Sequence, residues 1–187
     1  MGSPTILEFI DRFRLEMSHG VLAPFRDPEN HKKLMQRIFL LSKMACCSYE
    51  LVQLPPSLLA ASILSLAVKM TVKAVPSIHF NSLDLKCLIK TSAKLAQDFR
   101  ASKILDQTKA LLRFVSTFES DFPNLKNIKA TYPEEFPELQ ALNSHHYESQ
   151  TNLVGSSLKV GIDDDNPEDE LEAAAVVSLK GLKVTAS

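Results

Sequence analysis

Three cysteines are the residues best suited to carry out chemistry, and two of them, Cys46 and Cys47, are adjacent. A pair of thiols could act as a nucleophile or as a redox centre. On a helix, however, adjacent side chains point about 100° apart, and Lys43 is the one nearby basic residue that could lower a thiol pKa. We therefore expect Cys46 and Cys47 to pack in the core and Cys87 to be buried or partly buried. An odd number of cysteines argues against a disulfide framework and favours free thiols in a reducing compartment.

A second candidate is the histidine pair His145-His146, which Tyr147 and Glu148 follow. These side chains could bind a metal ion, but adjacent histidines lack the fixed spacing of a built site. Solvated histidines are the favoured interpretation. The 187 residues include five glycines and contain no GxGxxG, Walker, HExxH or CxxC motif. No catalytic, cofactor-binding or metal-binding residue is therefore predicted, and no cofactor is expected.

A third candidate is a basic stripe on a predicted helix, formed by Lys32, Lys33 and Arg37, with Lys43 further along. It could meet an acidic partner or a phosphate, but a solvated face is the favoured interpretation. Residues 1–154 contain 18 basic and 15 acidic residues, which is only a small positive excess. A lobe that binds nucleic acid would be strongly basic, so a nucleic acid partner is not expected.

These candidates must be positioned by helices, because apolar residues recur at spacings of three and four over most of residues 3–120. Prolines and capping residues divide this stretch into five helices, and the low glycine count agrees with an all-α fold. The expected start signals are Ser3 as N-cap with Pro4 at the first position for the first helix, Asn81 with Asp84 for the fourth, and Ser102 as N-cap for the fifth.

The third predicted helix, residues 58–70, has almost no polar face, since apolar side chains surround Ser62 and Ser65. A helix that is apolar all round is a central helix against which others pack. Polar residues or prolines interrupt each apolar run before it reaches the roughly 20 residues of a bilayer span, so no membrane association is expected. The predicted fold is thus a single five-helix domain with a central apolar helix.

The chain beyond residue 120 changes in composition. Residues 121–146 contain several prolines and aromatics and are expected to form an irregular Pro-rich strap that a few side chains hold to the domain. Residues 147–187 are polar and contain the acidic block 163–170, so we expect a mostly disordered acidic tail. Within it, residues 171–184 could form an amphipathic helix on a partner, but a solubilising tail is the favoured interpretation.

The stretch from Leu34 to Met70 resembles the second cyclin box of the A/B-type (mitotic) cyclins. In that family a helix ends in a turn that carries a tyrosine, a Pro-Ser step follows, and an Ala-rich helix forms the centre of the lobe. Pro4-Thr5 at the start is also similar to the Pro-Thr start of that lobe, and the resemblance covers about residues 3–120. The matching residues are Tyr49, Pro56-Ser57 and Ala60-Ala61 to Ala67.

The resemblance implies a non-catalytic regulatory protein that associates with a cyclin-dependent protein kinase in cell-cycle control and mitosis. The first cyclin box of the family, which supplies most of the kinase-gripping surface, has no counterpart in this sequence, so no partner-binding residue can be carried over. The chain is either part of a larger cyclin or a protein that kept one lobe for another purpose. Arg12-Phe13-Arg14-Leu15 matches the loose R-x-x-L pattern of the family's destruction motifs, but Phe13 lies on the expected core face.

The alternative is a scaffold or adaptor with a cyclin-box fold that binds other proteins without a kinase role, and an enzyme ranks third. The N-terminus does not resemble a secretory signal. We therefore expect an intracellular protein in the nucleus, the cytoplasm or both.

Overall fold

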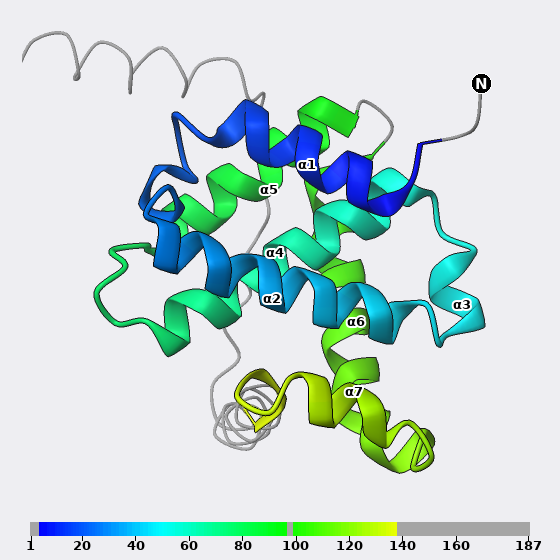
Figure 1. Cartoon of the computed structure of the whole chain (residues 1–187). Helices are drawn as coiled ribbons and strands as arrows, with labels where there is room; N and C mark the ends of the chain where they lie inside the picture. Colours follow the sequence, from blue (N-terminus) through cyan, green and yellow to red (C-terminus); the bar gives the residue numbers. More distant parts are fainter. Residues whose placement is uncertain (1–3, 97–98, 138–187) are drawn as a thin grey trace, which may run out of the picture. The chain divides into compact units, whose positions relative to one another are not determined.

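A computed structural model of the chain describes residues 4–96 and 99–137. The chain divides into two units, residues 1–151 and 152–187, and all described residues belong to the first. The described part is all-helical and contains no β-strand (Figure 1). Its elements are α1 (Ile6–Met17), the 3₁₀ helix η1 (Ala23–Phe25), α2 (Pro28–Ala45), α3 (Tyr49–Val52), α4 (Pro56–Ala74), α5 (Ser82–Ala96), α6 (Ala101–Asp121) and α7 (Lys126–Thr131).

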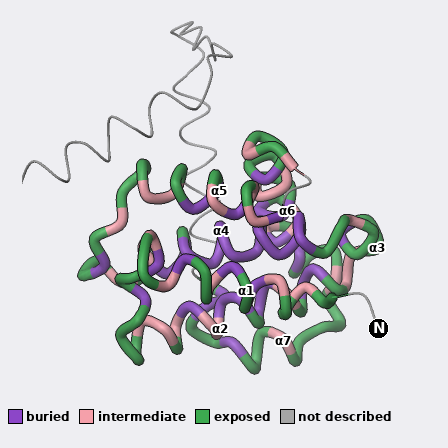
Figure 2. The backbone as a smooth tube through the Cα atoms, turned by 90° about the horizontal axis from the view of Figure 1, so that it is seen from above, coloured by how far each residue is buried: buried purple, intermediate pink, exposed green. Residues whose placement is uncertain are grey.

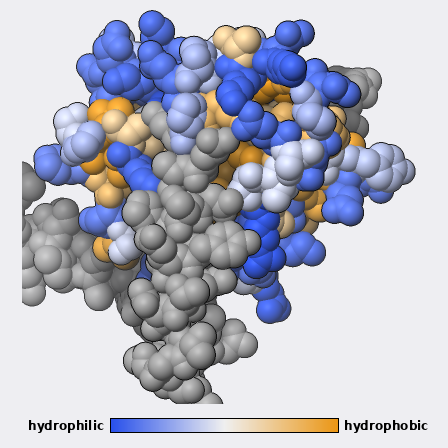
Figure 3. All heavy atoms as spheres, turned by 90° about the horizontal axis from the view of Figure 1, so that it is seen from below, coloured by the Kyte–Doolittle hydropathy of each residue, from blue (hydrophilic) through white to orange (hydrophobic). Residues whose placement is uncertain are grey.

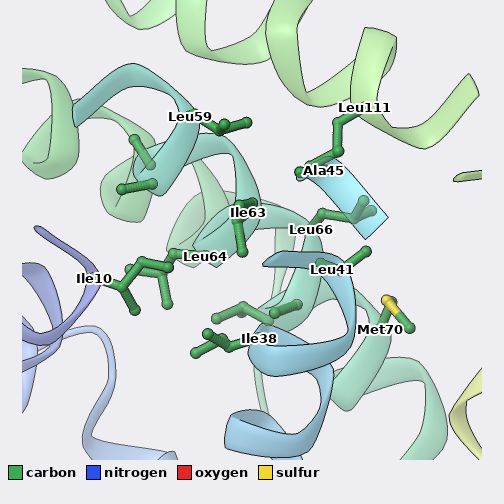
Figure 4. Packing of buried hydrophobic residues seen from close by; sticks show 14 of the residues in the cluster. Ile10, Ile38, Leu41, Ala45, Leu59, Ile63, Leu64, Leu66, Met70 and Leu111 are labelled. Atoms are coloured by element: carbon green, nitrogen blue, oxygen red, sulfur yellow. The ribbon is translucent and has the colours of Figure 1, made fainter. Parts of the chain in front are cut away.

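Helix α4 is the central helix, as its sequence predicts. It packs against α1, α2, α5 and α6, and seen from above it is buried along most of its length (Figure 2). Side chains of the surrounding helices point toward it, among them Ile10 of α1 and Ile38 of α2 (Figure 4). Because residues 57–68 of α4 are all buried, its continuous apolar sequence is removed from water.

Three buried hydroxyl groups on α4 all have hydrogen-bond partners. Ser62, Ser65 and Thr71 each donate a hydrogen bond to the carbonyl oxygen four residues earlier, at 2.9, 2.7 and 2.8 Å. A buried hydroxyl that bonds its own helix leaves no polar group unpaired. These short hydroxyl side chains can therefore face neighbouring helices without a polar partner on those helices.

By length and composition alone, α4 could cross a membrane. The other helices bury 78% of its most apolar window, however. Such burial is typical of the core helix of a globular domain.

The five long helices agree with the predicted fold, but two of the expected start signals are wrong. Helix α1 begins at Ile6 rather than at Pro4, because Thr5 and Glu8 form a capping box: the Thr5 N–H donates to the Glu8 carboxylate at 2.6 Å. Helix α6 begins at Ala101, and its N-cap, Arg100, makes no side-chain cap bond. The structure therefore gives no capping role to Ser102.

The capping pair predicted for α5 is present. The Asn81 side chain accepts hydrogen bonds from the N–H groups of Leu83 and Asp84 at 2.8 and 3.0 Å. The Asp84 carboxylate in turn accepts from the Asn81 N–H at 2.8 Å. These reciprocal bonds satisfy donors that the first turn of a helix leaves free.

The segment after α6 is more regular than the expected strap, since it contains α7. Two aromatic side chains anchor it, because Tyr132 and Phe136 are buried in the core cluster. At its start, the Phe122 ring stacks on Phe118 of α6 with the centroids 4.9 Å apart. Residues 138–146 of the expected strap and the whole expected tail, 147–187, lie outside the described residues.

Candidate functional site

The structure contradicts the predicted burial of Cys46 and Cys87, whereas Cys47 packs against the core cluster as predicted. Cys46 and Cys87 are exposed, and only Cys47 is partly buried. Cys46 is the C-cap residue of α2, and Cys87 lies on the solvent-facing side of α5. The sequence pattern predicted that Cys46 and Cys87 would be buried. The position of Cys46 at a helix end and of Cys87 on an exposed helix face leaves both in solvent.

The surroundings of Cys47 reduce the reactivity of its thiol. Its thiol donates a hydrogen bond to the Lys43 carbonyl oxygen, with 3.4 Å between sulfur and oxygen. Desolvation by burial, with a smaller contribution from the neighbouring Cys46, raises the pKa of the Cys47 thiol. A raised pKa lowers the thiolate fraction, so Cys47 is not an activated nucleophile.

No metal centre emerges from the described part of the chain. Residues 4–96 and 99–137 bring together no group of three or more His, Cys, Asp or Glu side chains that could hold a metal ion. The candidate ligands His145, His146 and Glu148, with Tyr147, lie outside this range.

The basic stripe predicted on α2 is broken by Arg37. Lys32 and Lys43 are exposed, but Arg37 is 3% exposed and its guanidinium donates to the Lys33 carbonyl oxygen at 2.9 Å. Arg37 therefore belongs to the interior and not to an outer face. The sequence alone could not predict this burial, because the spacing of Arg37 from the neighbouring lysines is the same whether its side of α2 is covered or exposed.

A cavity of about 280 Å³ lies between α2 and the segment that follows α7. Its charged lining comes from Glu29, Lys32 and Lys33 on one side and from Glu134 and Glu135 on the other. Carboxylates and ammonium groups are mixed within it, so the cavity presents no single charge to a ligand. We assign no ligand to it.

A basic face that the sequence analysis missed lies on α5. Lys86, Lys90 and Lys94 are all exposed and follow one another at intervals of four residues. Four residues of α-helix make slightly more than one turn, so the three ammonium groups share one side of α5. We call these three lysines the α5 lysine face. The i, i+4, i+8 spacing of the three lysines is the sequence signal for this face.

Large apolar side chains are exposed on α2 and α3. Phe39 of α2 is 41% exposed, and Tyr49 and Val52 of α3 are 77% and 47% exposed. Tyr49 and Val52 are three residues apart and therefore lie on the same side of their short helix. We call these three residues the α2–α3 apolar surface. Exposed aromatic side chains are enriched at protein interfaces, so this surface is the best candidate in the described part for contact with another protein.

Apolar residues also reach the surface elsewhere. Seen from below in Figure 3, hydrophobic side chains are visible among hydrophilic ones on one face of the molecule. In the R-x-x-L sequence of α1, Arg12 and Leu15 are exposed while Phe13 is fully buried. The motif is thus held in a helix, with its second residue in the core.

One family model matches the part of the chain with this architecture. The model described as "Cyclin, C-terminal domain" matches residues 4–134, which include every helix from α1 to α7. No curated protein and no solved structure matches the chain.

Proposed function

The chain belongs to the cyclin C-terminal domain family, and from that premise we propose that it is a regulatory protein that associates with a cyclin-dependent protein kinase. The family is in general regulatory and not enzymatic. The observation that carries the proposal is the extent of the match, since residues 4–134 comprise the central helix α4 together with all the helices packed on it. The chain therefore has the whole lobe and not an isolated motif.

The finer part of the proposal concerns the process. The Tyr49 turn, the Pro56-Ser57 step and the Ala-rich α4 resemble the A/B-type lobe, which supports a role in cell division and mitosis. Such a role places the protein in the nucleus, the cytoplasm or both. In this proposal the chain itself carries out no catalysis.

The contact with a protein partner is assigned to the α2–α3 apolar surface. A partner that covers Phe39, Tyr49 and Val52 removes apolar area from water, and each such side chain contributes through that burial. Phe39 lies on α2, and Tyr49 and Val52 lie on α3, the short helix between α2 and α4 in the chain.

The test is affinity capture of purified cyclin-dependent kinases by the full chain. We expect capture by the wild-type chain and a loss of capture in the double variant Phe39→Glu/Val52→Glu. The control is Leu83→Glu, which places one of the two added charges on an exposed leucine, 71% accessible on α5, and should leave capture unchanged. Circular dichroism melting of each variant separates loss of contact from loss of fold.

Two outcomes would contradict parts of the proposal. If no kinase binds the folded chain, even when a first cyclin box is supplied as a separate protein, the kinase role is wrong and an adaptor for other proteins becomes the better explanation. If a kinase binds the wild-type chain and the double variant equally well, the association stands but the α2–α3 apolar surface is not the contact.

A further inference from the structure

The α5 lysine face is a positive surface without compensation from its own helix. Helix α5 is buried along one side and exposed along the other (Figure 2), and the three lysines lie on the exposed side. None of Lys86, Lys90 and Lys94 forms an ion pair with another described residue. The one carboxylate on α5, that of Asp84, accepts a hydrogen bond from the Asn81 N–H at 2.8 Å. The three ammonium groups therefore present an uncompensated positive charge to solvent.

The positive charge of residues 4–137 is concentrated around α5. Residues 82–113, which comprise α5 and the first part of α6, contain seven basic and three acidic residues. The rest of the range 4–137 contains 11 basic and 10 acidic residues and is nearly neutral. Because α5 packs against α6, the excess belongs to one pair of neighbouring helices. A concentrated charge of one sign attracts a partner of the opposite sign.

The spacing of the three lysines also destabilises α5. Lys86 and Lys90 are four residues apart, as are Lys90 and Lys94, and like charges at this spacing repel each other on a helix. No acidic residue of α5 lies three or four positions from any of the three. Carboxylates brought to the face from outside α5 would remove the repulsion, so binding of an anion and stability of the helix are coupled.

The row of lysines has the spacing of a second helix. Four residues of α-helix rise about 6 Å, so the three ammonium groups extend over about 12 Å. Carboxylates at positions i, i+4 and i+8 of another helix have the same spacing. Rows of opposite charge pair neighbouring helices in this way along coiled coils. An acidic helix laid along α5 can therefore bring one carboxylate to each lysine.

Two other polyanions fit the face less well. Each strand of duplex DNA has a phosphate about every 3.4 Å along the axis, which differs from the spacing of the lysines, and α5 contains no arginine or aromatic residue to read or stack on bases. Helices that bind lipid surfaces insert an apolar side, but the apolar side of α5, with Leu88 and Ile89, is buried in the core cluster. These observations favour an acidic protein segment.

We propose that the α5 lysine face binds an acidic helical segment of a protein partner, with three carboxylates at four-residue spacing. Each exposed ion pair contributes little by itself, so the affinity depends on all three carboxylates being in register with the lysines. The contact does not depend on the proposed kinase association, and its test requires no kinase.

The test titrates the ¹⁵N-labelled full chain at low salt with a synthetic helical peptide of alanine and glutamine that has three glutamates at four-residue spacing. We expect the backbone amide signals of residues 82–96 to shift and saturate, and the shifts to disappear in 1 M salt, where the Debye length is about 3 Å. In Lys86→Gln/Lys90→Gln/Lys94→Gln the dissociation constant should rise about tenfold, because three weak ion pairs are lost. The corresponding triple Lys→Arg variant keeps the charge and should bind as the wild-type chain does.

Two controls separate the α5 lysine face from net charge and from folding. Lys69→Gln/Lys103→Gln/Lys126→Gln removes three charges at exposed positions outside α5, and the dissociation constant should change by less than about threefold. The α5 triple Gln variant should melt at the same temperature as the wild-type chain or higher, because it removes like-charge repulsion. If the control variant loses binding as fully as the α5 variant, net charge explains the effect and the proposal is wrong.

Other probes test the register and the class of partner. A peptide of the same composition with its glutamates on different sides of the helix should bind several-fold more weakly, and equal affinity would overturn the proposal. A short DNA duplex and vesicles of phosphatidylserine and phosphatidylcholine represent the other polyanions. If either of these shifts the signals of residues 82–96 and the acidic peptide does not, the face binds nucleic acid or lipid and the proposal is wrong.

Discussion

The ammonium group of Lys43 lies 4.9 Å from the centroid of the Tyr132 ring. Lys43 is in the last turn of α2, and Tyr132 follows α7 near the end of the described chain. The Tyr132 ring is buried, with 9% of the residue exposed. This contact therefore joins the C-terminal segment to α2, a helix that itself packs on α4.

The Lys43–Tyr132 contact should be measurable as a coupling energy. In a double-mutant cycle of Lys43→Gln and Tyr132→Leu, we expect a coupling of about 0.5–1 kcal/mol from the cation–π interaction. Urea unfolding of the four proteins measures it. Tyr132→Phe retains an aromatic face and should preserve most of the coupling energy. A coupling energy of zero in the Lys43→Gln/Tyr132→Leu cycle would show that the contact contributes nothing to stability.

The central position of α4 predicts a large difference between two leucines. Leu64 is fully buried and Leu83 is 71% exposed. Leu64→Ala should lower the free energy of unfolding by about 2–5 kcal/mol, and Leu64→Asp should prevent folding because the charge has no partner in the core. Leu83→Asp should change stability by less than about 0.5 kcal/mol. Thermal melts by circular dichroism test this, and a helical Leu64→Asp protein with an unchanged melting temperature would contradict the assigned core.

The capping box of α1 predicts a pH dependence. The hydrogen bonds from the Thr5 backbone and side chain lower the pKa of Glu8 below its ordinary value of 4.5. A lowered folded-state pKa stabilises the fold above the unfolded-state pKa, and the contribution is lost as the pH falls through the folded-state pKa. The melting temperature of the wild-type chain should therefore exceed that of Glu8→Gln at neutral pH, and the difference should shrink below about pH 4.5.

The control for the capping prediction is Glu16→Gln on the same helix, because the Glu16 side chain accepts no hydrogen bond from another described residue. Its melting-temperature difference from the wild-type chain should vary less with pH. A Glu8→Gln difference that stays constant from pH 7 to pH 3 would mean that the capping box does not form in solution.

The three thiols should differ in reactivity. Cys46 and Cys87 are exposed, whereas burial raises the pKa of Cys47 and reduces its thiolate fraction. At pH 8 iodoacetamide should modify Cys46 faster than Cys47, as followed by mass mapping of tryptic peptides from the native chain. In denaturant the difference between the two should nearly disappear. Equal rates in the native chain would show that Cys47 is not shielded.

Periodicity and proline positions were sufficient to predict the long helices. The central position of α4 was also predictable, because a helix that is apolar on all sides must be covered by other helices on all sides. The Asn81–Asp84 capping pair was also predictable, since both partners are local in sequence. Thr5 and Ser3 could both cap α1 by residue type, and only the reciprocal bond with Glu8 decides between them. Short helices such as α7 depend on tertiary anchors, here Tyr132 and Phe136, that no local pattern encodes.

The candidate surfaces were harder to predict than the fold. The burial of Arg37 and the exposure of Cys46 and Cys87 depend on which neighbour covers each side of α2 and α5. The spacing of Lys86, Lys90 and Lys94 already places them on one side of α5, and the structure adds that this side is exposed. Periodicity defines which residues share a face, but packing determines which face is solvated.

The most direct test of the account is the activity of a purified cyclin-dependent kinase titrated with the full chain, alone and together with a separate first cyclin box. We expect phosphorylation of a peptide substrate to rise with chain concentration and to saturate, and Phe39→Glu/Val52→Glu to shift the titration to higher concentration while Leu83→Glu does not. Kinase activity that stays constant over the whole titration, with a chain that melts cooperatively, would contradict the proposed regulatory role.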